Sequence, residues 1–141
     1  TLIELLLVMA IVAILAVIAN AGYSAIFDDL KIKKAIGDIY EIELLIERYN
    51  TQHNSLPNNL TDVGAPTIDP WEQPYEYLPF TPSTSNGLKR KSHGTVPLNS
   101  DYDLYSIGPD GNSVTPLTAT HSKDDIVRAS NGGFVGLGAD Y

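Results

Sequence analysis

The sequence contains no cysteine, so no disulfide stabilises its fold, and Ser or Thr would have to serve as any nucleophile. Basic residues are scarce: nine Lys and Arg stand against 17 Asp and Glu, and the net charge is −8. Nucleic-acid binding usually needs a basic face and is not expected. Proline is missing between Thr1 and Leu56. A long uninterrupted helix is therefore possible there.

Signatures of enzymes are missing as well. His53, His93 and His121 are scattered and do not have the spacing of metal ligands. The Gly-x-Ser-x-Gly turn that exposes a nucleophilic serine does not occur. We therefore expect no enzymatic activity.

The first 27 residues are mostly apolar and carry one charge. Residues 5–19 contain no polar side chain, and Asp28 and Asp29 are the next charged residues after Glu4. About 20 apolar residues can span a bilayer as a helix. A carboxylate in such a segment is costly and is kept only with a partner or a function. The next cation, Lys31, is too far along the same helix, so we expect a partner for Glu4 on another molecule.

A helix should continue beyond the apolar segment. Apolar residues recur every three or four positions from Ile32 to Tyr49, which predicts an amphipathic helix ending near Gln52, before Leu56-Pro57. Loosening near Asn20-Ala21-Gly22 is possible, because Asn and Gly are weak helix formers. The apolar half must lie in lipid or in a bundle of its own kind.

The remaining sequence predicts short elements. Asn58 or Asn59 could cap a two-turn helix that ends at Gly64. Residues 81–97 read as a loop whose basic cluster, 89–91, is either a docking patch or a solvated tip. Strands are expected at residues 75–78, 101–107 and 134–137. The fold class is thus α+β, a long N-terminal helix with a small antiparallel sheet, divided into residues 1–27 and 28–141.

Three motifs carry a resemblance to a known family. Thr1-Leu2-Ile3-Glu4-Leu5-Leu6 resembles the mature N-terminus of the type IV pilin superfamily. The segments 69–77, DPWEQPYEY, and 102–111, YDLYSIGPDG, are similar to motifs of the major pseudopilins of type II secretion systems. The resemblance implies a pilin-like fold and a methylated N-terminus. It also implies that Glu4 pairs with the N-terminal amine of a neighbouring subunit.

The family's function is structural. The resemblance implies a subunit that waits in the inner membrane and then joins a periplasmic or surface helical fibre, with minor pseudopilins and an inner-membrane assembly platform as further partners. A fibre that drives protein secretion is the first interpretation. A type IV pilin of a surface filament for adhesion or motility is the alternative. A monomeric binding domain anchored in the membrane is the third.

Charges along the predicted helix suggest how neighbouring subunits align. The lysines precede the glutamates by about two to four helical turns, so a staggered neighbour can set basic against acidic segments. The residues concerned are Lys31, Lys33, Lys34, Glu41, Glu43 and Glu47.

Acidic residues near the C-terminus raise the question of a metal. By residue type, Asp110 and the pair Asp124-Asp125 are either a calcium cage assembled from two segments or a solvated acidic loop. The resemblance favours calcium, because major pseudopilins bind it with aspartates at the matching positions. It adds the backbone carbonyl of Ile107 as a further ligand.

Overall fold

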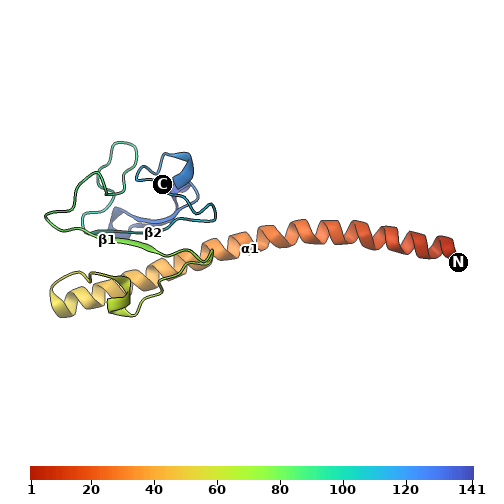
Figure 1. Cartoon of the computed structure of the whole chain (residues 1–141), viewed down its shortest axis with the longest axis horizontal. Helices are drawn as coiled ribbons and strands as arrows, with labels where there is room; N and C mark the ends of the chain where they lie inside the picture. The colour runs from red at the N-terminus through yellow and green to blue at the C-terminus, as the bar shows by residue number, and fades with distance from the viewer. The chain divides into compact units, whose positions relative to one another are not determined.

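The computed structural model describes the backbone of residues 1–141 and the side chains of all residues except 19–25. One long helix, four strands and four short 3₁₀ helices follow one another along the chain (Figure 1). The predicted α+β fold, a long N-terminal helix with a small antiparallel sheet, is confirmed.

Helix α1 covers Leu2–His53. The helix ends close to the residue that the sequence predicts. Asn54, just beyond its end, takes a positive φ of 50°, and its amide still donates to the carbonyl of Asn50 at 2.8 Å. A left-handed residue just beyond the last turn is a common helix stop. Pro57 follows and disfavours a restart.

The chain divides into two units, Thr1–Lys31 and Ile32–Tyr141. In the first unit, the apolar side chains from Leu2 to Ile18 are exposed. Within the part of the chain whose side chains are described, no helix is both long enough and apolar enough to cross a membrane. The loosening expected near Asn20-Ala21-Gly22 lies outside the described residues. The predicted boundary between residues 27 and 28 stays a prediction.

The second unit, residues 32–141, is called the head below. Its four-stranded antiparallel sheet has the order β1-β2-β3-β4. The strands are β1 (Glu76–Pro79), β2 (Tyr102–Ser106), β3 (Ile126–Ala129) and β4 (Phe134–Leu137). Three of them lie where the sequence predicts, while β3 was not expected. The predicted two-turn helix before Gly64 is a single 3₁₀ turn, Leu60–Val63.

The main core lies between α1 and one face of the sheet (Figure 1). The helix contributes the stripe Ala35, Ile39, Ile42 and Ile46, each at most 1% exposed. Tyr75, Tyr102, Leu104 and Ile126 pack against this stripe from the sheet side. The predicted spacing of three and four residues therefore marks the buried face of the helix.

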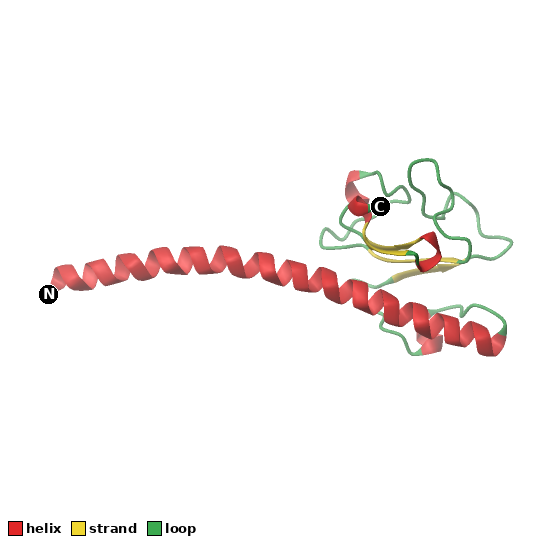
Figure 2. Cartoon of the chain, turned by 180° about the vertical axis from the view of Figure 1, so that it is seen from behind, coloured by secondary structure: helices red, strands yellow, loops and turns green.

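A second, smaller core covers the opposite face of the sheet. It joins Val127 and Ala129 of β3 to Leu98 and Leu117 of the connections. Strand β3 is therefore buried on both faces, which removes the alternation of apolar and polar residues that marks a half-buried strand. Loops and turns form most of the rest of the head (Figure 2).

The core can be tested with two neighbouring residues of α1. Ile42→Ala should lower the free energy of unfolding by about 2–5 kcal/mol, because it leaves a cavity in the main core. Leu44→Ala is the matched control, since Leu44 is 69% exposed; it should change stability by about 0.5 kcal/mol or less. Thermal or urea unfolding in mild detergent, followed by Trp71 fluorescence, measures both. Equal losses would place the core elsewhere.

Candidate functional site

The motif at residues 69–77 is organised by a buried carboxylate. Asp69 Oδ1 accepts hydrogen bonds from the amides of Trp71 and Gln73, both at 2.9 Å. Its other oxygen accepts the hydroxyl of Ser106, whose Oγ in turn accepts the amide of Gly108 at 3.1 Å. Asp69 thus ties the first motif to the second at the end of β2.

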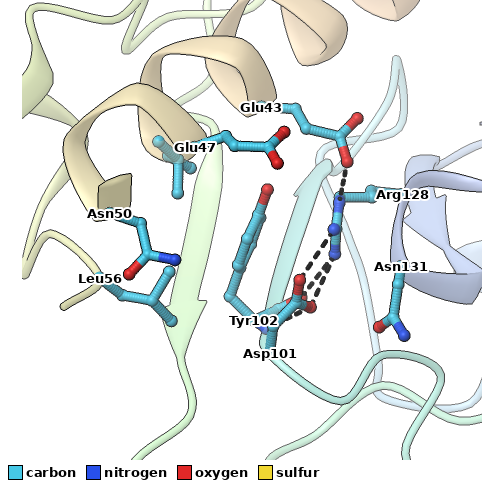
Figure 3. A pocket seen from close by; sticks show the side chains of 9 residues that line it. Glu43, Glu47, Asn50, Leu56, Asp101, Tyr102, Arg128 and Asn131 are labelled. Carbon is cyan, nitrogen blue, oxygen red and sulfur yellow. Dashed lines mark hydrogen bonds and ion pairs between the residues drawn. The ribbon is translucent and has the colours of Figure 1, made fainter. Parts of the chain in front are cut away.

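A polar hollow of the head lies between α1 and the sheet (Figure 3). It has a volume of about 350 Å³ and is lined on the helix side by Glu43, Glu47 and Asn50. Arg128 crosses it: Nε donates to Glu43 Oε1 at 2.8 Å, and Nη1 and Nη2 donate to the Asp101 carboxylate at 2.9 Å. The guanidinium also lies 4.1 Å from the centre of the Tyr102 ring. These contacts join α1 to β2 and β3, so the hollow reads as a structural junction.

Gly132 is the small residue that this junction requires. Its φ is +86°, and a Cβ there would lie 2.1 Å from Glu43 Oε1. A side chain at this position would therefore push away the carboxylate that Arg128 holds.

The predicted assembly residues fall into two groups. Lys34 pairs with Asp38 of its own helix at 2.7 Å, and Glu43 pairs with Arg128, so these two charges are used within the chain. Lys33, Glu41 and Glu47 are exposed, and Lys31 is half-buried. In the first unit, Glu4 accepts a hydrogen bond from the amine of Thr1. The pairings between subunits stay predictions.

The predicted metal residues are only partly brought together. The amide of Asp110 donates to Asp124 Oδ2 at 3.3 Å, and Gly108 lies so close to the Asp124 carbonyl that a Cβ would come within 2.4 Å of it. Asp110 Oδ1 accepts the amide of Asn112, and its Oδ2 lies 3.6 Å from His121 Nδ1. Gly108 and Asp110 are thus held against Asp124.

Asp125 faces a different cation. It is fully buried, and its Oδ2 accepts hydrogen bonds from Arg90 and from the Ser113 hydroxyl, the latter at 2.6 Å. Burial raises the pKa of the Asp125 carboxyl, and the bonds from Ser113 and Arg90 oppose that rise. Among the described residues, no group of three or more His, Cys, Asp or Glu side chains is placed to hold a metal ion. The three aspartates do not fit the cage that the resemblance implies, and calcium binding stays a prediction.

Two functional residues escaped the sequence analysis. Arg90 lies in the basic cluster expected to be a docking patch or solvated tip, yet it is 3% exposed. Arg128 follows Ile126-Val127 in the strand that was not expected. For Arg128, the sequence signal that could have found it is an arginine directly after the apolar pair Ile126-Val127, in a chain with few cations. No such signal marks Arg90.

Comparison with known proteins agrees with the motifs. The chain is 28% identical to a Pseudomonas aeruginosa protein named type II secretion system core protein G, and the match covers 79% of this chain and 82% of that protein. The resemblance to the major pseudopilins is confirmed. No family model matches the chain, and no solved structure matches it significantly. In this pseudopilin-like chain, both head motifs are structural: Asp69 organises one, and Tyr102 of the other packs beneath Arg128.

The junction at Arg128 can be tested by removing its charge. Arg128→Met should lower the free energy of unfolding by about 3 kcal/mol, because it leaves the carboxylates of Glu43 and Asp101 without their cation. Arg48→Met is the control; Arg48 is an exposed residue of α1, and its replacement should cost about 0.5 kcal/mol or less. Urea unfolding measures the free energy of unfolding of both variants. Similar stability of the two would show that the junction does not hold the head together.

Proposed function

We propose that this chain is a structural subunit that polymerises through the apolar part of α1 into a periplasmic pseudopilus that drives type II protein secretion. The similarity to type II secretion system core protein G supports the proposal that the chain acts in a secretion system of this type. The described head supports a structural role, because its charged residues are used to join elements. We propose no catalytic activity.

One observation carries the assembly mechanism. The large apolar side chains from Leu2 to Ile18 are 49–79% exposed, on every side of the helix. Apolar surface of this extent is rarely left in water and marks an interaction with lipid or protein. The same surface can serve in both settings: in the inner membrane before assembly, and against copies of itself in the fibre core afterwards.

The partners follow from this proposal. The chain would bind other copies of itself, with minor pseudopilins and an inner-membrane assembly platform as its further partners. Methylation of the N-terminal amine belongs to the same proposal. The amine and Glu4 of neighbouring subunits would neutralise each other in a dry core, where opposite charges attract far more strongly than in water.

Glu4 provides the test of assembly. In cells, Glu4→Ala should leave the amount of membrane-associated subunit unchanged and strongly reduce both the fibre recovered by shearing and the secreted protein. The reason is that each added subunit would bury an N-terminal amine without its counter-charge. Fibre yield by electron microscopy and immunoblot measures the effect.

Asp140→Ala is the control, because Asp140 is an exposed carboxylate of the head. It should assemble normally. Normal fibre yield from Glu4→Ala would refute the proposed pairing. Loss of surface filaments without a secretion defect, in a strain that lacks the protein, would instead favour the alternative, a type IV pilin.

The register of the fibre can be tested through the exposed charges of α1. Glu41→Lys with Glu47→Lys should reduce fibre yield and change the stability of the head by less than about 1 kcal/mol, since exposed pairs contribute little each. Adding Lys31→Glu should restore part of the yield. Glu43→Lys is the contrast: it should destabilise the head itself, because it sets a cation against Arg128. No recovery in the triple variant would argue against pairing of these segments.

A further inference from the structure

Arg90 is a buried cation at the centre of the head. Its side chain is 4% exposed and pairs with the fully buried carboxylate of Asp125. Its guanidinium lies 4.2 Å from the centre of the Tyr105 ring in β2 and also donates to the Ser113 hydroxyl. A buried ion of either sign is very costly without its partner, so the positions of Arg90 and Asp125 depend on each other.

The backbone around Arg90 fixes the guanidinium in place. The amide of Arg90 donates to Asp103 Oδ2 in β2 at 2.7 Å, and its carbonyl accepts the amide of Leu98 at 2.9 Å. The next residue, Lys91, exchanges backbone hydrogen bonds with Thr115 and Leu117, at 3.1 and 2.9 Å. The segment at Arg90 is therefore attached to β2 on one side and to the β2–β3 connection, residues 107–125, on the other.

The two unsatisfied atoms of this site complement each other. Among the described side chains, the buried polar atoms without a hydrogen-bond partner are Arg90 Nε, a donor, and Asp125 Oδ1, an acceptor. They belong to the two members of one ion pair. A small rotation to the two-bond arrangement that arginine forms with carboxylates would satisfy both.

The chain thus supplies its own cation at a carboxylate that the resemblance assigns to calcium. A divalent ion bound to Asp125 would lie beside the Arg90 guanidinium, and two cations this close repel each other strongly in a buried site. We propose that Arg90 replaces a metal ion as the cation that holds residues 107–125 to the sheet, so that this connection stays ordered without calcium. The proposal concerns the head and holds whether or not the chain forms a secretion fibre.

Limited proteolysis can test this, because the connection contains one tryptic site. Lys123 is exposed and is the only Lys or Arg between residues 107 and 125. In the full chain in mild detergent, stripped of metal with a chelator, cleavage after Lys123 should be slow and should change less than about twofold when calcium is added. Arg90→Gln should speed this cleavage by at least about tenfold, because a broken buried ion pair raises the population of the open loop.

Three further variants complete the test. Lys91→Gln, the neighbouring cation, is the control and should be cleaved like the parent chain. Arg90→Lys keeps the positive charge but loses the planar set of N–H donors of the guanidinium. Its rate of cleavage after Lys123 should therefore lie between the rates of the parent chain and of Arg90→Gln. If Arg90→Gln does not fold, the double variant Arg90→Gln with Asp125→Asn, which removes both charges, should recover folding and part of the protection.

Two results would overturn the proposal. One is that stripping calcium from the parent chain speeds cleavage as much as Arg90→Gln does, which would make the metal the clamp. The other is that both Arg90 variants are protected like the parent in metal-free buffer.

Discussion

The pairing of Arg128 with Glu43 of α1 and Asp101 beside β2 is the contact on which the head depends. A helix that offers one apolar stripe can slide or rotate on a sheet, because apolar contacts are not directional. A guanidinium held by carboxylates from two elements fixes their relative position, since its donors lie in a rigid plane. Arg90 does the same for the β2–β3 connection. In a chain without cysteine, two buried arginines thus perform the cross-linking that disulfides perform elsewhere.

The sequence predicts those elements whose signal is local. The stripe from Ala35 to Ile46 and the alternation at residues 101–107 each show a period that one segment carries by itself. Strand β3 has no such period, because Ile126 faces one core and Val127 the other. Its existence depends on residues distant in sequence that cover both faces. Periodicity alone could not reveal it.

The same reasoning explains why the site was only partly predicted. Asp110 and Asp124 were expected to approach each other, and they do so through the turn at Gly108. Asp125 is grouped with them by its residue type and by the resemblance. Adjacent residues of an extended segment point in opposite directions, and here the second one turns inward to Arg90. A basic cluster in a loop rich in Ser, Thr, Gly and Pro looks solvated, and nothing within it shows that its middle residue is buried. The partner that draws Arg90 inward lies 35 positions away.

Ion pairs within the chain reduce the number of charged residues of α1 that could form contacts between subunits. Lys34 and Glu43 are paired within the chain. Of the other residues expected to set the register, Glu41 and Glu47 are exposed on α1 and Lys31 is half-buried. Each exposed pair between helices would contribute under about 1 kcal/mol, so such pairs cannot supply the strength of a fibre. In the proposed fibre, that strength would come from the apolar residues 2–18, whose packing would be strong but would tolerate sliding. The few exposed charges would then select one relative position of neighbouring helices among many that bury a similar apolar area. Each pair would contribute little free energy, but the contribution would be repeated at every subunit.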